Sequence, residues 1–210
     1  MSLGAPCNVV VLISGSGSNL QALIDSLGED NPVRIRAVVS NRAEAFGLQR
    51  AQAAGIATHV VQHKDFADRE AFDAALMEII DTHEPQLVVL AGFMRILTAP
   101  FVEHYAGRML NIHPSLLPLY PGLGTHQQAI DAGDKEHGAT VHFVTAELDH
   151  GPIVAQARVP VLPDDTEDTL SARLLVEEHK LYPYAVRLFV EDRLSIEEHG
   201  DVRIKDGALA

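Results

Sequence analysis

Asn111, His113 and Ser115 alternate in the segment MLNIHPSLLPLYPG, residues 109–122. The apolar residues around Asn111 predict a buried strand that ends near it. Each of the prolines that follow fixes its own φ and pushes the residue before it toward an extended backbone. We therefore expect Asn111 and His113 to be held rigidly at a strand end, a position that suits catalysis better than packing.

An Asn, a His and an Asp together can promote acyl transfer through a tetrahedral intermediate. The side-chain NH₂ of Asn111 and an N–H of His113 can both point at a developing oxyanion, and a nearby carboxylate such as Asp149 would stabilise the imidazolium and relay a proton. Ser115 follows Pro114 and lies in no GxSxG elbow. We interpret it as a turn residue, so the attacking atom is expected to come from a substrate.

A glycine-rich turn, SGSGSNLQALI, follows the first expected strand and opens a helical pattern. Its free backbone N–H groups and the positive end of the helix dipole favour an anionic oxygen. A dinucleotide fingerprint would need glycine where Leu20 stands, and a triphosphate loop would need Gly-Lys-Ser/Thr. The turn predicts a site for one phosphate monoester, with a glycine turn of purely conformational role as the alternative.

The first half of the chain alternates buried strands with helical patterns. Apolar runs lie at residues 8–14, 35–40, 57–62 and 87–93, and apolar residues three and four apart fill the stretches between them. This order predicts an α/β fold with a doubly wound, mostly parallel sheet and helices on both faces. Ligands of such sheets bind outside the carboxyl ends of the strands, so residues 15–19, 92–97 and 111–113 are expected to converge there.

The second half predicts antiparallel additions to the sheet. Two short strands flank a turn at residues 149–152, and the first of them alternates polar and apolar residues as a half-exposed strand does. A helix is expected over residues 167–192, capped by Asp165 or Thr166 and kinked at Pro183. The polar tail from Ile196 is expected to fray.

The crowded prolines make Leu117–Pro118 the best candidate for a cis bond.

Length and charge limit the class of protein. A chain of 210 residues that is 47% hydrophobic is expected to form one domain, residues 1–210. Its net charge of −13 argues against nucleic-acid and anionic membrane partners. The apolar N-terminal run is too short for a membrane span and lacks the basic residues of a leader, which predicts the cytoplasm. We interpret the single cysteine, Cys7, as structural.

A metal site is not predicted. The sequence holds no HExxH motif and no cysteine pair. His137 and His142 are five residues apart on an expected strand and would point to opposite faces.

The segment HPSLLPLYPG, preceded by Asn111 and followed by LDHGP, resembles the signature of the folate-dependent formyltransferases. Further stretches are similar, in order, to the members of that family that act on glycinamide ribonucleotide in purine biosynthesis: VVLISGSGSNLQALI, VVSNRAEAFGLQRAQAAGI, VVLAGFMRIL, HGATVHFV and EEHKLYP. The resemblance runs from about residue 8 to residue 194. It implies a Rossmann-like formyltransferase fold, with nucleotide binding in the N-terminal half and folate binding in the C-terminal half.

The implied reaction is direct transfer of the formyl group of 10-formyltetrahydrofolate, a co-substrate, to the amine of phosphoribosylglycinamide. It implies no metal and only small-molecule partners, in a monomer or homodimer. The resemblance assigns catalysis to Asn111, His113 and Asp149, phosphate and ribose binding to Gly15, Ser16, Gly17, Ser18, Asn19 and Glu178, and folate binding to Arg69, Met94, Arg95, Ile96, Leu97, Asn111, Thr145, Ala146, Glu147, Leu148 and Asp149. The chain departs from the family at Leu119, where a basic residue is common, and at Gly124, where a histidine is common.

Relatives with the same signature formylate an initiator tRNA, formylate amino sugars or hydrolyse formyltetrahydrofolate. A tRNA substrate calls for a basic appended domain, which does not fit this length and charge. A hydrolase is expected to carry an extra N-terminal regulatory domain, whereas the first strand here is expected from about residue 8. The glycine-rich turn favours a phosphorylated acceptor. A non-catalytic module that senses a folate or a nucleotide is a further alternative, against which the presence of all three candidate catalytic residues argues.

Overall fold

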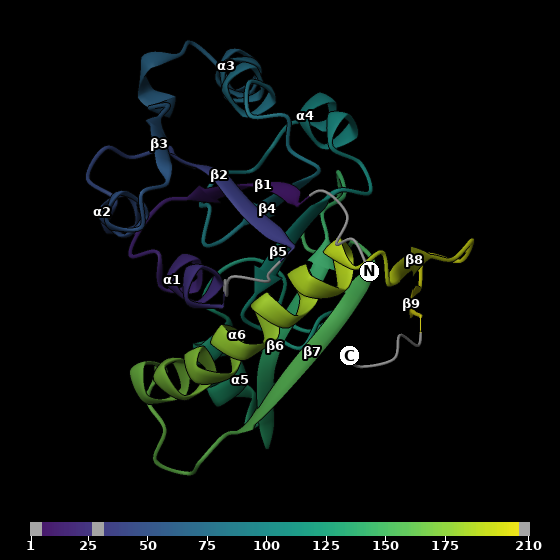
Figure 1. Cartoon of the computed structure of the whole chain (residues 1–210). Coiled ribbons are helices and arrows are strands. Elements are labelled where there is room, and N and C mark those ends of the chain that lie inside the picture. Colours follow the sequence, from purple (N-terminus) through teal and green to yellow (C-terminus); the bar gives the residue numbers. More distant parts are fainter. Residues whose placement is uncertain (1–5, 27–31, 206–210) are drawn as a thin grey trace. The chain divides into compact units, whose positions relative to one another are not determined.

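The computed structural model describes residues 6–26 and 32–205 (Figure 1). The chain divides into two compact units, Met1–Asn111 and Ile112–Ala210. The division falls within a strand, β5 (Met109–His113), so this strand contributes residues to both units.

The first unit is an open parallel sheet with helices in the connections. Its strands are β1 (Cys7–Ile13), β2 (Val33–Ser40), β3 (Ala57–Val60), β4 (Leu87–Leu90) and the first part of β5, in the order β3-β2-β1-β4-β5. Every pairing among them is parallel. The connecting helices are α1 (Ser18–Asp25), α2 (Phe46–Ala53), the short 3₁₀ helix η1 (His63–Asp65), α3 (Arg69–Asp81) and α4 (Ala99–His104). This arrangement confirms the doubly wound order predicted from the sequence.

The central strands of the first unit are apolar without alternation because both of their faces are buried. In β1 the side chains from Val9 to Ile13 are at most 1% exposed, and all of β4 is buried. Helix α3 buries Phe72, Leu76 and Ile80, which recur every four residues and form one face of the helix.

The second unit continues from the end of β5 into an antiparallel pair. Strands β6 (Glu136–Phe143) and β7 (Ile153–Pro160) pair antiparallel, in the order β5-β6-β7. Helices α5 (Thr125–Ala132) and α6 (Glu167–Val190) complete this unit, and α6 runs across β6 and β7 (Figure 1). A capping box between Thr166 and Thr169 starts α6, which confirms the predicted helix and its cap. Pro183 lies inside α6.

Two sequence expectations for the second unit are wrong. Strand β6 is not half-exposed: every residue after Glu136 is buried, because α5 and α6 pack against it. The polar tail does not fray within the described residues, since β8 (Leu194–Ile196) pairs antiparallel with β9 (Val202–Ile204). Apolar residues face each other across this hairpin and stabilise it, with Leu194 opposite Ile204. Residues 206–210 lie outside the described part of the chain.

The proline-rich loop contains the predicted cis peptide bond, Leu117–Pro118.

No helix within residues 6–26 and 32–205 is long and apolar enough to cross a membrane.

Candidate active site

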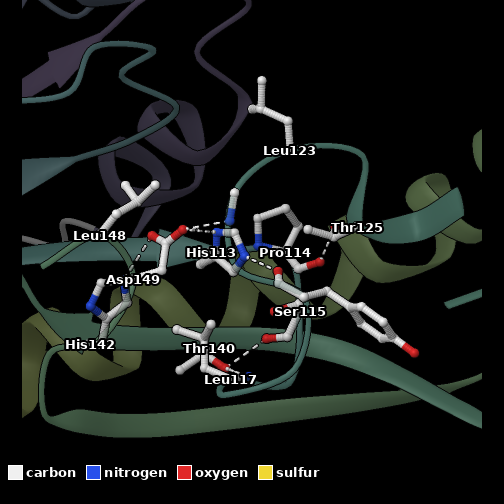
Figure 2. A network of polar contacts seen from close by, with 12 residues as sticks. His113, Pro114, Ser115, Leu117, Leu123, Thr125, Thr140, His142, Leu148 and Asp149 are labelled. Atoms are coloured by element: carbon white, nitrogen blue, oxygen red, sulfur yellow. Dashed lines mark hydrogen bonds and ion pairs between the residues drawn. The ribbon is translucent and has the colours of Figure 1, made fainter. Parts of the chain in front are cut away.

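A buried carboxylate lies between two buried imidazoles in the second unit. Figure 2 shows Asp149 between the rings of His113 and His142. The Nδ1 atom of His113 is 3.5 Å from Oδ2 of Asp149, and Nε2 of His142 is 3.8 Å from Oδ1. All three side chains are at most 7% exposed. The structure therefore brings together the His113 and Asp149 that the sequence singled out, 36 residues apart.

Strand ends and turns place these groups. His113 is the last residue of β5, and Asn111 stands two residues before it on the same face of that strand. Asp149 lies in the turn between β6 and β7 with φ 54°, a left-handed conformation that Asp adopts more readily than most residues. The backbone N–H of Gly122 donates to Oδ2 of Asp149 at 2.9 Å and holds the carboxylate in place.

The contacts of His113 define which nitrogen can take part in chemistry. Its Nε2 lies 2.8 Å from the carbonyl oxygen of Tyr120, which can only accept, so Nε2 carries a hydrogen. The Nδ1 atom faces Asp149 at a distance longer than a good hydrogen bond. This nitrogen is therefore the one left for proton exchange with a substrate or with Asp149.

His142 is a component of the site that sequence analysis missed. Its Nδ1 donates to the Phe143 carbonyl oxygen at 2.9 Å. Burial lowers the pKa of His142, and the raising effects of this hydrogen bond and of Asp149 do not reverse the shift. The lowered pKa favours an uncharged His142 beside Asp149 at neutral pH. Sequence alone did not reveal this contact, because Asp149 approaches His142 only once the turn between β6 and β7 is formed.

The proline-rich loop is tied to β6 and α5 by hydroxyl groups. Thr140 donates to the Ser115 carbonyl oxygen at 2.7 Å and accepts from the Leu117 N–H at 3.1 Å. The hydroxyl of Thr125 donates to the Pro114 carbonyl oxygen. The Ser115 hydroxyl donates to the Leu119 carbonyl oxygen, which confirms that Ser115 is a turn residue.

The glycine-rich turn of the first unit is packed against α2. Gly17 has φ 69° and forms the N-cap of α1, and a Cβ added to it would lie 2.5 Å from Cα of Gly47. The Gly47 N–H donates to the Gly15 carbonyl oxygen at 3.0 Å. Among the described residues, the backbone N–H groups of Ser16 and Gly17 have no acceptor. They remain available to bind an anion.

Arg50 adds a positive charge beside this turn and was not found from the sequence. Its Nε donates to the Ser16 carbonyl oxygen at 2.9 Å, and its guanidinium lies 4.9 Å from the centre of the Phe46 ring. Arg50 comes from the middle of α2, 34 residues beyond Ser16. Only the fold brings it to the turn.

The carboxyl ends of β1 and β4 meet as predicted. The Met94 N–H, in the segment that follows β4, donates to the hydroxyl of Ser14, just after β1, at 2.7 Å. In this part of the structure the backbone groups of Arg95, Ile96 and Leu97 have no hydrogen-bond partner. A bound molecule with donors and acceptors of its own could pair with them.

The remaining predicted residues lie on different elements. Arg69 starts α3, and Glu178 is buried on α6. Residues 144–152 connect β6 to β7, and within them the hydroxyl of Thr145 donates to the Glu147 carbonyl oxygen at 3.2 Å. The described residues contain no group of three or more His, Cys, Asp or Glu arranged to hold a metal ion.

Comparison with known proteins identifies the family. The model of the Formyl transferase family matches residues 7–186. The chain belongs to this formyltransferase family. It is 57% identical over 194 residues to the phosphoribosylglycinamide formyltransferase of Escherichia coli K12, covering 91% of each chain. It is 47% identical over 195 residues to the human trifunctional purine biosynthetic protein adenosine-3, of which it spans 19%.

Solved formyltransferase structures confirm the predicted fold class. The glycinamide ribonucleotide transformylase 1 of Symbiobacterium toebii superposes with a TM-score of 0.94 at 49% identity, over 97% of this chain and 96% of that one. The Coxiella burnetii phosphoribosylglycinamide formyltransferase gives 0.91 at 49% identity, over 98% and 96% of the two chains.

Proposed function

We propose that this chain transfers the formyl group of 10-formyltetrahydrofolate to the amine of phosphoribosylglycinamide, a step of purine biosynthesis. The observation that carries this proposal is the 57% identity to the Escherichia coli enzyme of that name over 91% of both chains. The buried pair of His113 and Asp149 supports it, because a carboxylate beside an imidazole is a suitable acid–base device for acyl transfer.

The proposed step is a direct displacement at the formyl carbon. The acceptor amine attacks this carbon, and a tetrahedral intermediate forms with a negative charge on the formyl oxygen. The Nδ1–H of His113 and the side-chain amide of Asn111 donate to that oxygen. The bond to N10 of the folate then breaks, and the proton lost by the amine passes through Asp149 to the leaving nitrogen.

The chain offers no activated nucleophile of its own for this step. The Ser115 hydroxyl already donates to a backbone carbonyl oxygen. Cys7 is buried in β1, and burial raises the pKa of its thiol, which disfavours the reactive thiolate. Both observations support transfer from donor to acceptor without a formyl-enzyme.

We assign the acceptor phosphate to the turn formed by residues 15–19, where the Ser16 and Gly17 amides are available and Arg50 lies alongside. Glu178 is proposed to bind the ribose. The donor is assigned to Arg69, to residues 94–97 and to residues 145–149. The proposed reaction uses small-molecule substrates without a metal and takes place in the cytoplasm.

A formyltetrahydrofolate hydrolase is the second candidate, since water could replace the amine in the same chemistry. The free amides of the glycine-rich turn favour the transferase, because water needs no phosphate site. The test is to incubate the purified chain with the donor alone and with donor plus phosphoribosylglycinamide. We expect the formylated amine in the second reaction and negligible formate in the first. Formate released equally in both would favour the hydrolase.

A matched acceptor tests the phosphate site. Charge-assisted hydrogen bonds contribute about 1.5–3 kcal/mol each, so the dephosphorylated acceptor should bind at least about tenfold more weakly. Equal use of the two acceptors would exclude residues 15–19 as a phosphate site.

A further inference from the structure

The segment between β4 and α4 has a backbone fixed by two buried side chains. It contains no helix or strand from Ala91 to Thr98. The Met94 N–H donates to Oγ of Ser14 at 2.7 Å, and the Thr98 N–H donates to Oδ2 of Asp73 at 2.6 Å. Ser14 is 3% exposed and Asp73 is 2% exposed. This irregular segment is therefore anchored in its middle and at its end from inside the first unit.

The anchor at Ser14 has one possible hydrogen-bond direction. A backbone N–H can only donate, so the Ser14 hydroxyl accepts from Met94 and must donate its own hydrogen elsewhere. It donates to Oδ1 of Asn41 at 2.6 Å, and Asn41 is itself buried just after β2. The hydroxyl thus joins the carboxyl ends of β1 and β2 to the segment after β4.

The anchor at Asp73 is a buried carboxylate. Asp73 lies on α3 beside the core residue Phe72, and among the described residues no cationic group lies within salt-bridge distance of it. A buried carboxylate is destabilising unless its charge is paired or fully hydrogen-bonded. An apolar residue at position 73 could pack in the core but could not bind the Thr98 N–H. The carboxylate therefore indicates that the backbone at Thr98 has to be held in place.

Between its two anchors, the segment after β4 has exposed side chains and unpaired backbone groups. The side chains of Met94 and Ile96 are 60% and 59% exposed, and the backbone groups from Arg95 to Leu97 have no partner among the described residues. Between the two anchors, the structure holds three residues in a fixed path with their hydrogen-bonding groups unused.

We propose that Ser14 and Asp73 are positioning residues for the folate donor: they hold the backbone of residues 94–98 in the path that the donor recognises. The inference rests on the proposed function, in which residues 94–97 bind this donor. Neither side chain touches the donor. Each acts through the one amide that it binds.

Steady-state kinetics of Ser14→Ala and Asp73→Ala test the proposal. Loss of one such anchor should raise the KM for the donor about tenfold, while the KM for the phosphorylated acceptor and kcat change less than about twofold. Asp73→Asn keeps an oxygen that can accept from Thr98, so its donor KM should stay close to that of the parent. A donor KM unchanged in both alanine variants would overturn the proposal.

The matched control is Asp81→Ala, which removes another carboxylate of α3. Asp81 accepts from the Tyr105 hydroxyl at 2.9 Å and lies 2.8 Å from Nε2 of His104, so it contacts α4 and its C-cap instead of residues 94–98. It should lower thermal stability without raising the donor KM. A rise as large as that of Asp73→Ala would show a general effect of loosening α3 and would overturn the positioning role.

Hydrogen exchange without substrate separates this inference from the proposed function. The Met94 and Thr98 amides should be protected in the parent, and each should exchange faster in the variant that lacks its anchor. Unchanged exchange would overturn the inference even in an active enzyme. Turnover of the parent is measured first, so a parent that uses no formyl-folate would refute the proposed function before any variant is compared.

Discussion

At the scale of single residues, the chemistry depends on what each polar side chain already contacts. Nε2 of His113 is occupied by the Tyr120 carbonyl oxygen, so in the proposed reaction Nδ1 and the adjacent Asp149 carry the reactive proton. Asn111 is half-buried in the middle of β5, and we propose that it supplies a second donor for the oxyanion. Removal of either donor is expected to lower kcat without weakening substrate binding.

Asn111→Ala should lower kcat by about 10²–10³-fold, because removal of one oxyanion donor typically has this effect. The KM values for both substrates should change little, since the charge on the formyl oxygen develops only in the transition state. Steady-state kinetics with each substrate varied in turn measure the two quantities. A variant with normal kcat and a raised donor KM would make Asn111 a binding residue instead.

Direct transfer predicts that the donor alone leaves the chain unmodified. The Ser115 hydroxyl is engaged and the Cys7 thiol is buried, so neither should accept a formyl group. Intact-mass measurement after incubation with 10-formyltetrahydrofolate should show the parent mass. A stable adduct of formyl mass that disappears on addition of acceptor would require a covalent mechanism.

At the scale of elements, α2 shapes the glycine-rich turn. A Cβ on Gly47 would lie 2.5 Å from Cδ1 of Ile13 and 3.1 Å from Cα of Gly17, so Gly47→Ala should displace the turn. Overpacking of this kind costs about 1–3 kcal/mol, and a tenfold or greater rise in the acceptor KM is expected with little change in the donor KM. The exposed Gln49→Ala on the same helix is the control. Equal effects of Gly47→Ala on both substrates would argue against a local role.

The contact between α5 and β6 should make stability depend on pH. Nε2 of His137 lies 3.0 Å from Nδ1 of His126, and burial, reinforced by His126, lowers the pKa of His137 to about 4. His113 lowers this pKa further, while the Pro114 carbonyl and Asp134 oppose the shift. The unfolded chain takes up this proton near pH 6.5 but the folded chain does not, so stability should fall as the pH drops from about 6.5 to about 4.

His137→Gln cannot take up that proton and should lose less stability over the same pH range, by at most about 1.4 kcal/mol for each pH unit. Urea unfolding at several pH values measures the difference. His199→Gln, an exposed position in the same unit, is the control. A pH dependence identical in the parent and His137→Gln would show that His137 is not the group responsible.

At the scale of the whole molecule, the sequence predicted what depends on continuous local patterns. The parallel order of the first unit follows from apolar runs such as that of β4, and Asn111, His113 and Asp149 stand out by their chemistry. Features set by distant contacts were missed: the burial of β6 depends on α5 and α6, and Arg50 reaches Ser16 only through the packing of α2. The hairpin of β8 and β9 was missed because the tail is polar overall.

The most direct test of this account is the rate of formyl transfer in a single turnover. The parent, His113→Ala and Asp149→Asn proteins are each mixed with 10-formyltetrahydrofolate and phosphoribosylglycinamide, with the protein in excess over the substrates. The formylated amine is quantified after rapid quenching. Loss of acid–base help lowers rates by about 10²–10⁴-fold, so both variants should form the product at least about a hundredfold more slowly than the parent. Product formation by His113→Ala at the parent rate would contradict the assignment of the chemistry to this pair.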